Sequence, residues 1–161
     1  MLIAIALAAA AASDATEYFN RMHTLEGNWK GTVQWTGVMT SKGEMGARYR
    51  ITGRGSALIE DLLDGEQPVM TSVYHLDKGD LRVTHYCGAQ NQPRLKAAAI
   101  DLQRNQVRFE FVDITNLARP DAPHVHGLTL RMIDKDHLLI EFAFISPAGE
   151  SVEHISLTRA G

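Results

Sequence analysis

The chain has 161 residues, of which 45% are hydrophobic and 22% charged, and its formal net charge is −3. This length and balance predict one globular domain with a core of its own. The charge, without a basic patch or a run of one sign, disfavours nucleic acid as a partner. Cys87 is the single cysteine, which excludes a framework of internal disulfides.

The N-terminus reads as a targeting segment. Met1–Ala12 is an apolar, alanine-rich run, and Ser13-Asp14 follow it. This pattern is typical of a secretory signal peptide, although a basic start is missing, and it is shorter than the roughly 20 apolar residues of a membrane span. We expect residues 1–12 to be a signal peptide or N-terminal extension and residues 13–161 to be a single domain. A signal peptide implies a periplasmic or extracellular protein, whereas a simple extension implies a cytoplasmic one.

A short helix is predicted next. Ser13 or Asp14 can cap its start, and apolar residues recur at helical spacing over about Ala15 to Thr24. A helix of this length is not stable alone, so it must rest on an apolar surface such as the end of a barrel.

From Gly27 onward the apolar period changes to two, which indicates strands. Trp29, Gly31, Val33 and Trp35 share one face of the first. The sequence predicts an all-β fold, an up-and-down antiparallel barrel of roughly 8–10 strands behind the short N-terminal helix. A loop with one helical turn at Thr115–Ala118 is expected before Pro123. The further strands are predicted over Glu44–Gly53, Ser56–Leu63, Pro68–Leu76, Leu81–Cys87, Leu95–Ile100, Gln106–Asp113, Val125–Ile133, Leu138–Ile145 and Val152–Thr158.

The clearest hairpin turns at Asp77–Asp80, where Gly79 can supply a positive φ. If Leu76 pairs with Leu81, then Ser72 faces His85. Their shared face is mostly apolar and should point inward, so its polar members need partners inside the barrel.

Two sets of residues resemble known proteins. Gly27-Asn28-Trp29 is similar to the Gly-x-Trp element that opens lipocalin-type barrels, where the Trp closes one end. The segments Thr84–Cys87, Asn91–Arg94 and His126–Leu130 resemble an uncharacterised bacterial family of exported, lipocalin-like proteins. The resemblance implies a calycin-type barrel and no known activity.

The function that these features favour is noncatalytic binding of a small, partly apolar ligand inside the barrel. Asn91 and Arg94 either contact the ligand at the mouth or only tie their loop down. The inward position of His126 depends on a strand parity that the sequence leaves open. The expected polar contacts are Tyr74, His85 and His126, with Asn91 and Arg94 at the mouth, and the expected apolar wall is Trp29, Trp35, Tyr49, Phe109 and Phe111.

A metal or haem site is an alternative. His85 and Cys87 share one strand face, as do His124 and His126, and four such ligands would suit zinc if the pairs met. A more distant resemblance to nitrobindin-like barrels implies haem held by one histidine on a late strand, for which His126 and His154 are the candidates. Otherwise His154 lies on the surface beside Glu153 or Glu141.

Catalysis has little support in the sequence. Ser72 and His85 could belong to a triad, yet no Gly-x-Ser-x-Gly elbow and no phosphate-binding glycine loop is present. We therefore expect no resident cofactor and a small-molecule partner. A haem- or metal-dependent enzyme and a structural or partner-binding barrel with a filled interior remain as alternatives, and the oligomeric state stays open.

Overall fold

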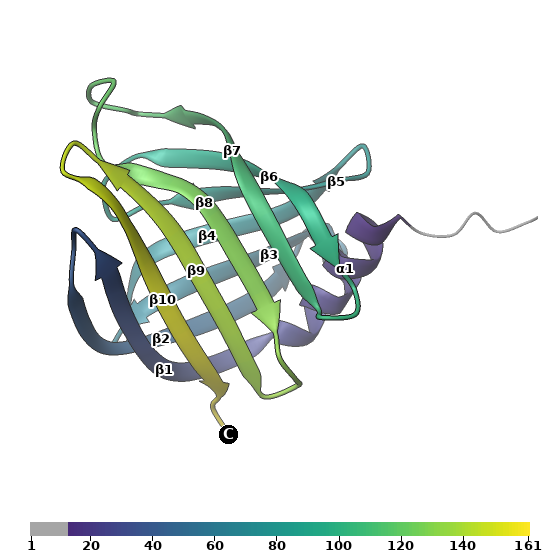
Figure 1. The fold of residues 1–161 in the computed structure, drawn as a ribbon. Coiled ribbons are helices and arrows are strands. Elements are labelled where there is room, and N and C mark those ends of the chain that lie inside the picture. The colour runs from purple at the N-terminus through teal and green to yellow at the C-terminus, as the bar shows by residue number, and fades with distance from the viewer. Residues whose placement is uncertain (1–12) are drawn as a thin grey trace, which may run out of the picture.

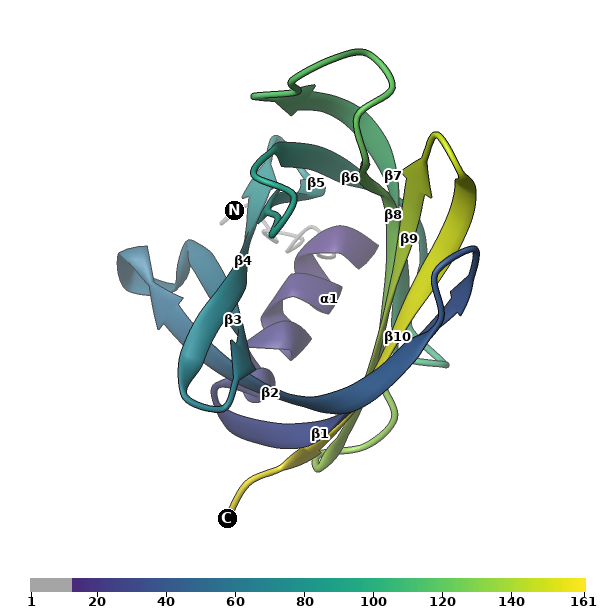
Figure 2. The ribbon, with the colours of Figure 1, turned by 90° about the vertical axis from the view of Figure 1, so that its left-hand side faces the viewer.

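The computed structural model describes residues 13–161, so the predicted signal segment at residues 1–12 lies outside the described residues. The described part forms ten antiparallel strands closed into one barrel, with α1 (Asp14–Met22) at one end (Figures 1 and 2). Neighbouring strands pair in sequence order and β1 pairs with β10, which confirms the predicted up-and-down barrel. The strands are β1 (Gly27–Gly37), β2 (Ser41–Thr52), β3 (Ala57–Asp64), β4 (Gln67–Asp77), β5 (Asp80–Tyr86), β6 (Gln92–Asp101), β7 (Gln106–Thr115), β8 (His124–Met132), β9 (His137–Ser146) and β10 (Gly149–Arg159).

Helix α1 plugs the end of the barrel where β1 begins. The Ser13 side chain accepts a hydrogen bond from the Thr16 N–H and caps the helix, as predicted. Tyr18, Phe19 and Met22 are buried, and the Tyr18 hydroxyl donates to the carbonyl of Leu130 at 3.1 Å. Figure 2 views the barrel roughly down its axis, with the strands arranged in a ring around α1. Within residues 13–161, no helix is long and apolar enough to cross a bilayer.

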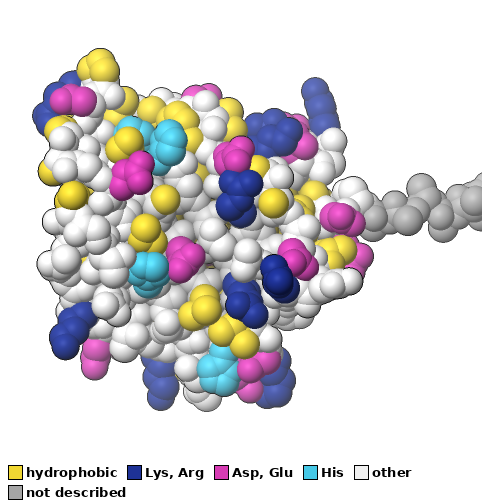
Figure 3. Space-filling view, viewed as in Figure 1, with side chains coloured by type: hydrophobic (Ala, Val, Ile, Leu, Met, Phe, Trp, Pro, Cys, Tyr) yellow, Lys and Arg dark blue, Asp and Glu magenta, His cyan; other side chains and the backbone are white. Residues whose placement is uncertain are grey.

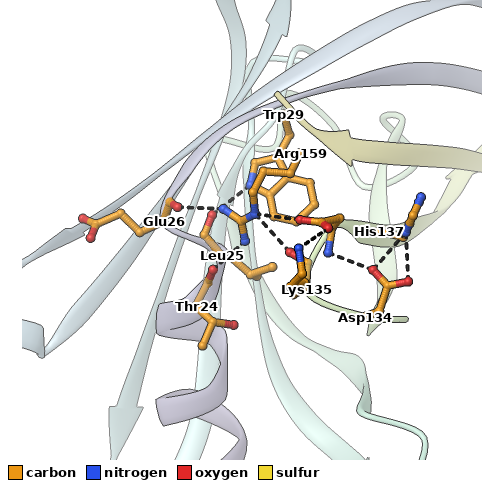
Figure 4. Close-up of polar contacts among 9 residues, drawn as sticks. Thr24, Leu25, Glu26, Trp29, Asp134, Lys135, His137 and Arg159 are labelled. Carbon is orange, nitrogen blue, oxygen red and sulfur yellow. Dashed lines mark hydrogen bonds and ion pairs between the residues drawn. The ribbon is translucent and has the colours of Figure 1, made fainter. Parts of the chain in front are cut away.

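Arg159, at the end of β10, fastens the plug to the barrel. Its guanidinium donates to the carbonyl oxygens of Thr24 at 2.7 Å, Glu26 at 3.0 Å and Lys135 at 3.0 Å (Figure 4). It also lies 4.3 Å from the centre of the Trp29 ring, whose N–H donates to the carbonyl of Leu25 at 2.8 Å. The same end of the barrel is thus sealed by an apolar helix and by a charged contact.

The hairpin of β4 and β5 has the predicted register, with Ser72 opposite His85, Tyr74 opposite Val83 and Leu76 opposite Leu81. The predicted helical turn at Thr115–Ala118 is wrong. Asn116 instead adopts a φ of 56°, a conformation that Asn tolerates, and its side-chain amide donates to the carbonyl of Gln90 at 2.6 Å. This contact ties the loop between β7 and β8 to the loop between β5 and β6.

The helix end of the barrel interior is largely packed. Trp29, Leu58 and Leu130 there are at most 3% exposed, while Ile51 and Leu76 are partly buried. The opposite end, here called the mouth, is formed by the loops at residues 38–40, 65–66, 87–91, 116–123 and 147–148. There, several lumen-facing side chains are only partly buried, although Val125 and Ser151 are 3% and 2% exposed. The partly buried residues, called the mouth lining below, are Val33, Trp35, Met45, Met70, Cys87 and Phe144.

Candidate functional site

A row of polar side chains crosses the interior between the plug and the mouth. Tyr49, Glu60, Ser72 and His85 lie directly opposite one another on β2, β3, β4 and β5. Each is at most 1% exposed. Because side chains alternate along a strand, this register places all four on the lumen face. We call these four residues the polar row.

Hydrogen bonds converge on Glu60. The Tyr49 hydroxyl donates to Glu60 Oε2 at 2.6 Å, and the Tyr74 hydroxyl donates to the same oxygen at 3.1 Å. Ser72 Oγ lies 2.9 Å from His85 Nδ1. Two buried polar atoms in this cluster, Glu60 Oε1 and His85 Nε2, have no hydrogen-bond partner in the part of the chain that the structure describes. Buried polar atoms are rarely left unpaired, so these two mark the cluster as a candidate site.

Burial shifts the protonation of both residues. It raises the pKa of Glu60 above its ordinary value, and the hydrogen bonds from Tyr49, Ser72 and Tyr74 offset part of that rise. Burial also lowers the pKa of His85 to about 4. The imidazole is therefore neutral at pH 7, with one nitrogen carrying hydrogen and the other able to accept a hydrogen bond.

Glu153 links the polar row to the mouth lining. It lies on β10 between Trp35 of β1 and Phe142 of β9, and is 4% exposed. Burial raises its pKa to about 7, a hydrogen bond from the Trp35 side chain offsets part of the rise, and the Glu60 charge adds to it. The Phe142 ring lies 4.7 Å from the His85 ring, measured between centroids. Both glutamates therefore belong to one connected interior site.

Between the plug and the mouth, the ionisable residues of the interior are acids, apart from a neutral histidine. Arg159 lies opposite Trp29 at the helix end; apart from it, no lumen-facing strand position that the structure describes carries Lys or Arg. The other lumen-facing ionisable groups are the carboxyls of Glu60 and Glu153, the hydroxyls of Tyr49 and Tyr74, the His85 imidazole and the Cys87 thiol.

Five of the predicted site residues lie in the polar cluster or on the strands around it. Tyr74 and His85 belong to the polar cluster. Trp29, at the helix end, and Phe109 are both buried. The Phe109 ring packs against Tyr74 with ring centroids 6.0 Å apart. Phe111 is partly buried on β7 toward the mouth.

Three predicted contacts lie elsewhere. Arg94 is exposed on the outer wall, where Nη2 donates to Asp113 Oδ2 at 2.7 Å. Asn91 is buried and ties its loop down by donating to the carbonyl of Pro123 at 2.9 Å. His126 is the extra residue of a β-bulge between Val125 and Gly127, so it leaves the face of Leu128 and is exposed.

The histidines proposed for haem or zinc do not gather in the lumen. His126 stacks on Phe111 with ring centroids 5.1 Å apart, and the His124 ring lies 5.9 Å from it. His154 is on the outer face, with Nδ1 2.9 Å from Glu141 Oε1 and Nε2 3.0 Å from Thr36 Oγ1. Neither late-strand histidine fits a haem bound inside the barrel. Within residues 13–161, no three or more His, Cys, Asp or Glu side chains are grouped as a metal site would require.

Sequence reasoning missed the two glutamates, although a signal was present. Glu60 alternates with Leu58 and Leu62, and Glu153 alternates with Ile155. A charged residue in register with an apolar strand face is the pattern of a buried carboxylate, because neighbours two apart share a face.

Residues 13–161 thus define a helix-plugged, ten-stranded antiparallel barrel with an acidic polar cluster inside. No protein-family model and no curated protein matches this chain. Among solved structures, it is similar to a protein of unknown function from the DUF3598 family of Nostoc punctiforme, with a TM-score of 0.57 and 13% identity over 86% of this chain and 48% of that one.

A second similar structure is Rv2717c from M. tuberculosis, with a TM-score of 0.56 and 13% identity over 89% of this chain and 98% of that one. At these identities the likeness shows the fold alone. This chain spans about half the length of the DUF3598 protein.

Proposed function

We propose that the protein is a noncatalytic binding protein, which takes a small, partly apolar molecule into the mouth half of its barrel as lipocalin-like proteins do. The observation that carries the proposal is the mouth lining. Its side chains face the lumen at the open end of the barrel yet stay partly exposed. Each apolar side chain left in water forgoes roughly 25 cal/mol per Å², which a bound apolar molecule would recover.

The surroundings of the mouth support entry of an apolar molecule. The loop between β1 and β2 exposes Val38 at 52% and Met39 at 42%, and further exposed apolar side chains on mouth-side strand segments are Val69, Tyr86 and Val112. The outer face over β8, β9 and β10 instead carries acidic, basic and histidine side chains side by side (Figure 3). A concave apolar site with a few polar groups beneath it is the usual form of a small-molecule site.

The geometry favours binding over hydrolysis by a triad. Ser72 contacts Nδ1 of His85, while Nε2 has no partner in the described residues, so no acid orients the imidazole. Both side chains are 0% exposed. A triad needs a nucleophile open to substrate and a base held by a third group.

A thermal-shift screen tests the proposal. A ligand present at 100 times its Kd stabilises the native state by about 2.7 kcal/mol, which raises the Tm of a domain of this size by several degrees. We expect such a shift with long-chain alcohols, amines or aromatic metabolites, and a smaller one in Trp35→Ala. Ile133→Ala, an exposed apolar side chain at the opposite end of the barrel, is the control. The absence of a shift across lipids, tetrapyrroles and aromatic metabolites would overturn the proposal in favour of a barrel with a filled interior.

The haem or metal alternative has its own measurement. Protein purified from its native host would show a Soret band or stoichiometric metal if that alternative were correct, whereas the binding proposal expects neither. Export through residues 1–12 stays a prediction, and N-terminal sequencing of the mature protein checks it.

A further inference from the structure

We propose that the bound molecule is a hydrophobic amine, whose ammonium group is held by Glu153 and Glu60 beneath the aromatic part of the mouth lining. This inference rests on the proposed function and adds the chemical class of the ligand. It stands on three observations: the charges of the lumen, its two unpaired buried polar atoms and the aromatic rings above them.

The lumen offers counter-charge to a cation and none to an anion. Glu60 and Glu153 face inward and lie close enough for their charges to interact. Arg159 is held on backbone carbonyls at the helix end; apart from it, no lumen-facing strand position in residues 13–161 carries Lys or Arg. A carboxylate ligand would add a third negative group without a partner, which is costly in a poorly hydrated site. An ammonium group would neutralise one of the two acids.

The free polar atoms of the cluster are those that accept hydrogen bonds. Once Glu60 is ionised, the hydroxyls of Tyr49 and Tyr74 donate to its Oε2. In the tautomer that carries hydrogen on Nδ1, His85 donates to Ser72 Oγ and the neutral imidazole has a bare Nε2.

Glu60 Oε1 and His85 Nε2, the two unpaired buried atoms, then both require a donor. An ammonium group carries up to three N–H donors and accepts nothing, so it matches this set of acceptors. An alcohol has a single O–H to donate, and a carboxylate has none.

Aromatic rings complete the site. Trp35 and Phe144 pack edge to face with centroids 5.6 Å apart, and Trp35 lies opposite Glu153 across the β1–β10 pair. A carboxylate beside aromatic faces is an arrangement that recognises ammonium groups, because the ring faces carry partial negative charge.

The proposal predicts proton release on binding at pH 7 and below, where Glu153 still holds a proton. The titratable groups that face Glu153 are the Glu60 carboxyl from β3 and the Cys87 thiol from β5, with the Trp35 indole beside it on β1. Each is neutral or negative, so none supplies the positive charge that would already ionise Glu153. An ammonium ligand therefore favours the ionised carboxyl and displaces its proton.

Three probes with one chain length test the inference: decylamine, decanol and decanoic acid, each titrated below its micelle concentration at pH 8 by calorimetry and Trp fluorescence. We expect decylamine to bind about tenfold tighter than decanol, the gain of one well-placed charge pair, and decanoate to bind more weakly than decanol. Glu153→Gln should lower the affinity for decylamine to nearly that for decanol and leave the affinity for decanol unchanged. Glu150→Gln, an exposed change on the same strand with the same loss of charge, should alter neither.

The outcomes separate the two proposals. If none of the three probes binds the wild-type protein, the proposed function fails and the inference fails with it. If decanol or decanoate binds as tightly as decylamine, the inference is wrong while the proposed function stands. The wild-type ranking decides this even if Glu153→Gln does not fold.

Discussion

Replacing Glu153 by Gln should change how stability depends on pH. Burial raises the pKa of this carboxyl from 4.5 to about 7, so between these pH values the native state holds a proton that the unfolded chain has released. Native stability therefore falls as the pH rises through this window, and the cost is complete above pH 7. At about 1.4 kcal/mol for each pH unit, the shift corresponds to about 3 kcal/mol of lost stability at pH 8 relative to pH 4.5.

Urea unfolding of the wild type and of Glu153→Gln at half-unit steps from pH 4.5 to pH 8 measures this quantity. The difference between the two free energies of unfolding isolates Glu153, because the other titrating groups are common to both. We expect it to grow in favour of the variant by about 3 kcal/mol across the window. Glu150→Gln is the matched control and should run parallel to the wild type. A variant whose pH profile parallels that of the wild type would show that Glu153 is not buried as an acid.

Three further substitutions test the fold. Gly31→Ala places a Cβ 1.8 Å from the Ser156 carbonyl oxygen and should cost about 3 kcal/mol or more, whereas Gly43→Ala, with Val33 Cγ1 at 3.8 Å, should be nearly neutral in thermal unfolding. Arg159→Ala removes three hydrogen bonds and the Trp29 contact and should lose about 3 kcal/mol in urea, while the exposed Arg131→Ala should lose almost nothing. The pKa of His85, about 4 in place of 6.5, gives stability that is present above pH 6.5 and lost as the pH falls. Between pH 6.5 and pH 4, the free energy of unfolding of His85→Phe should therefore fall by about 3 kcal/mol less than that of the wild type. An acid-unfolding profile identical to that of the wild type would contradict this.

The barrel and its hairpins could be predicted because the signals are local. Alternation along each strand and the Asp77–Asp80 turn fix which residues of β4 and β5 meet, so the contact of Ser72 with His85 follows from the sequence. The same reasoning placed Tyr74 and His85 on the lumen face. These predictions needed no knowledge of distant strands.

The remainder of the site depends on non-local geometry. One extra residue in β8 moves His126 from the expected face to the exterior, because a bulge breaks the period of two. Arg94 faces the outer wall instead of the mouth, and there it pairs with Asp113 on the neighbouring strand β7. Glu60 and Glu153 come to lie in one lumen only because β10 pairs with β1 and closes the barrel, and the sequence alone does not reveal this pairing.

The pairing of β1 with β10 also has a consequence for how the protein folds. It joins strands from the two ends of the described chain, so the ring cannot close until the last strand has been synthesised. Until then β1 and β9 present unpaired edges. The segment around Thr24 and Glu26 also lacks the hydrogen bonds from Arg159. Contacts of such long sequence separation slow folding, and they make the unclosed sheet the species most exposed to aggregation. The β1–β10 pairing that completes the lumen is thus also the step before which the unclosed sheet is most prone to aggregate.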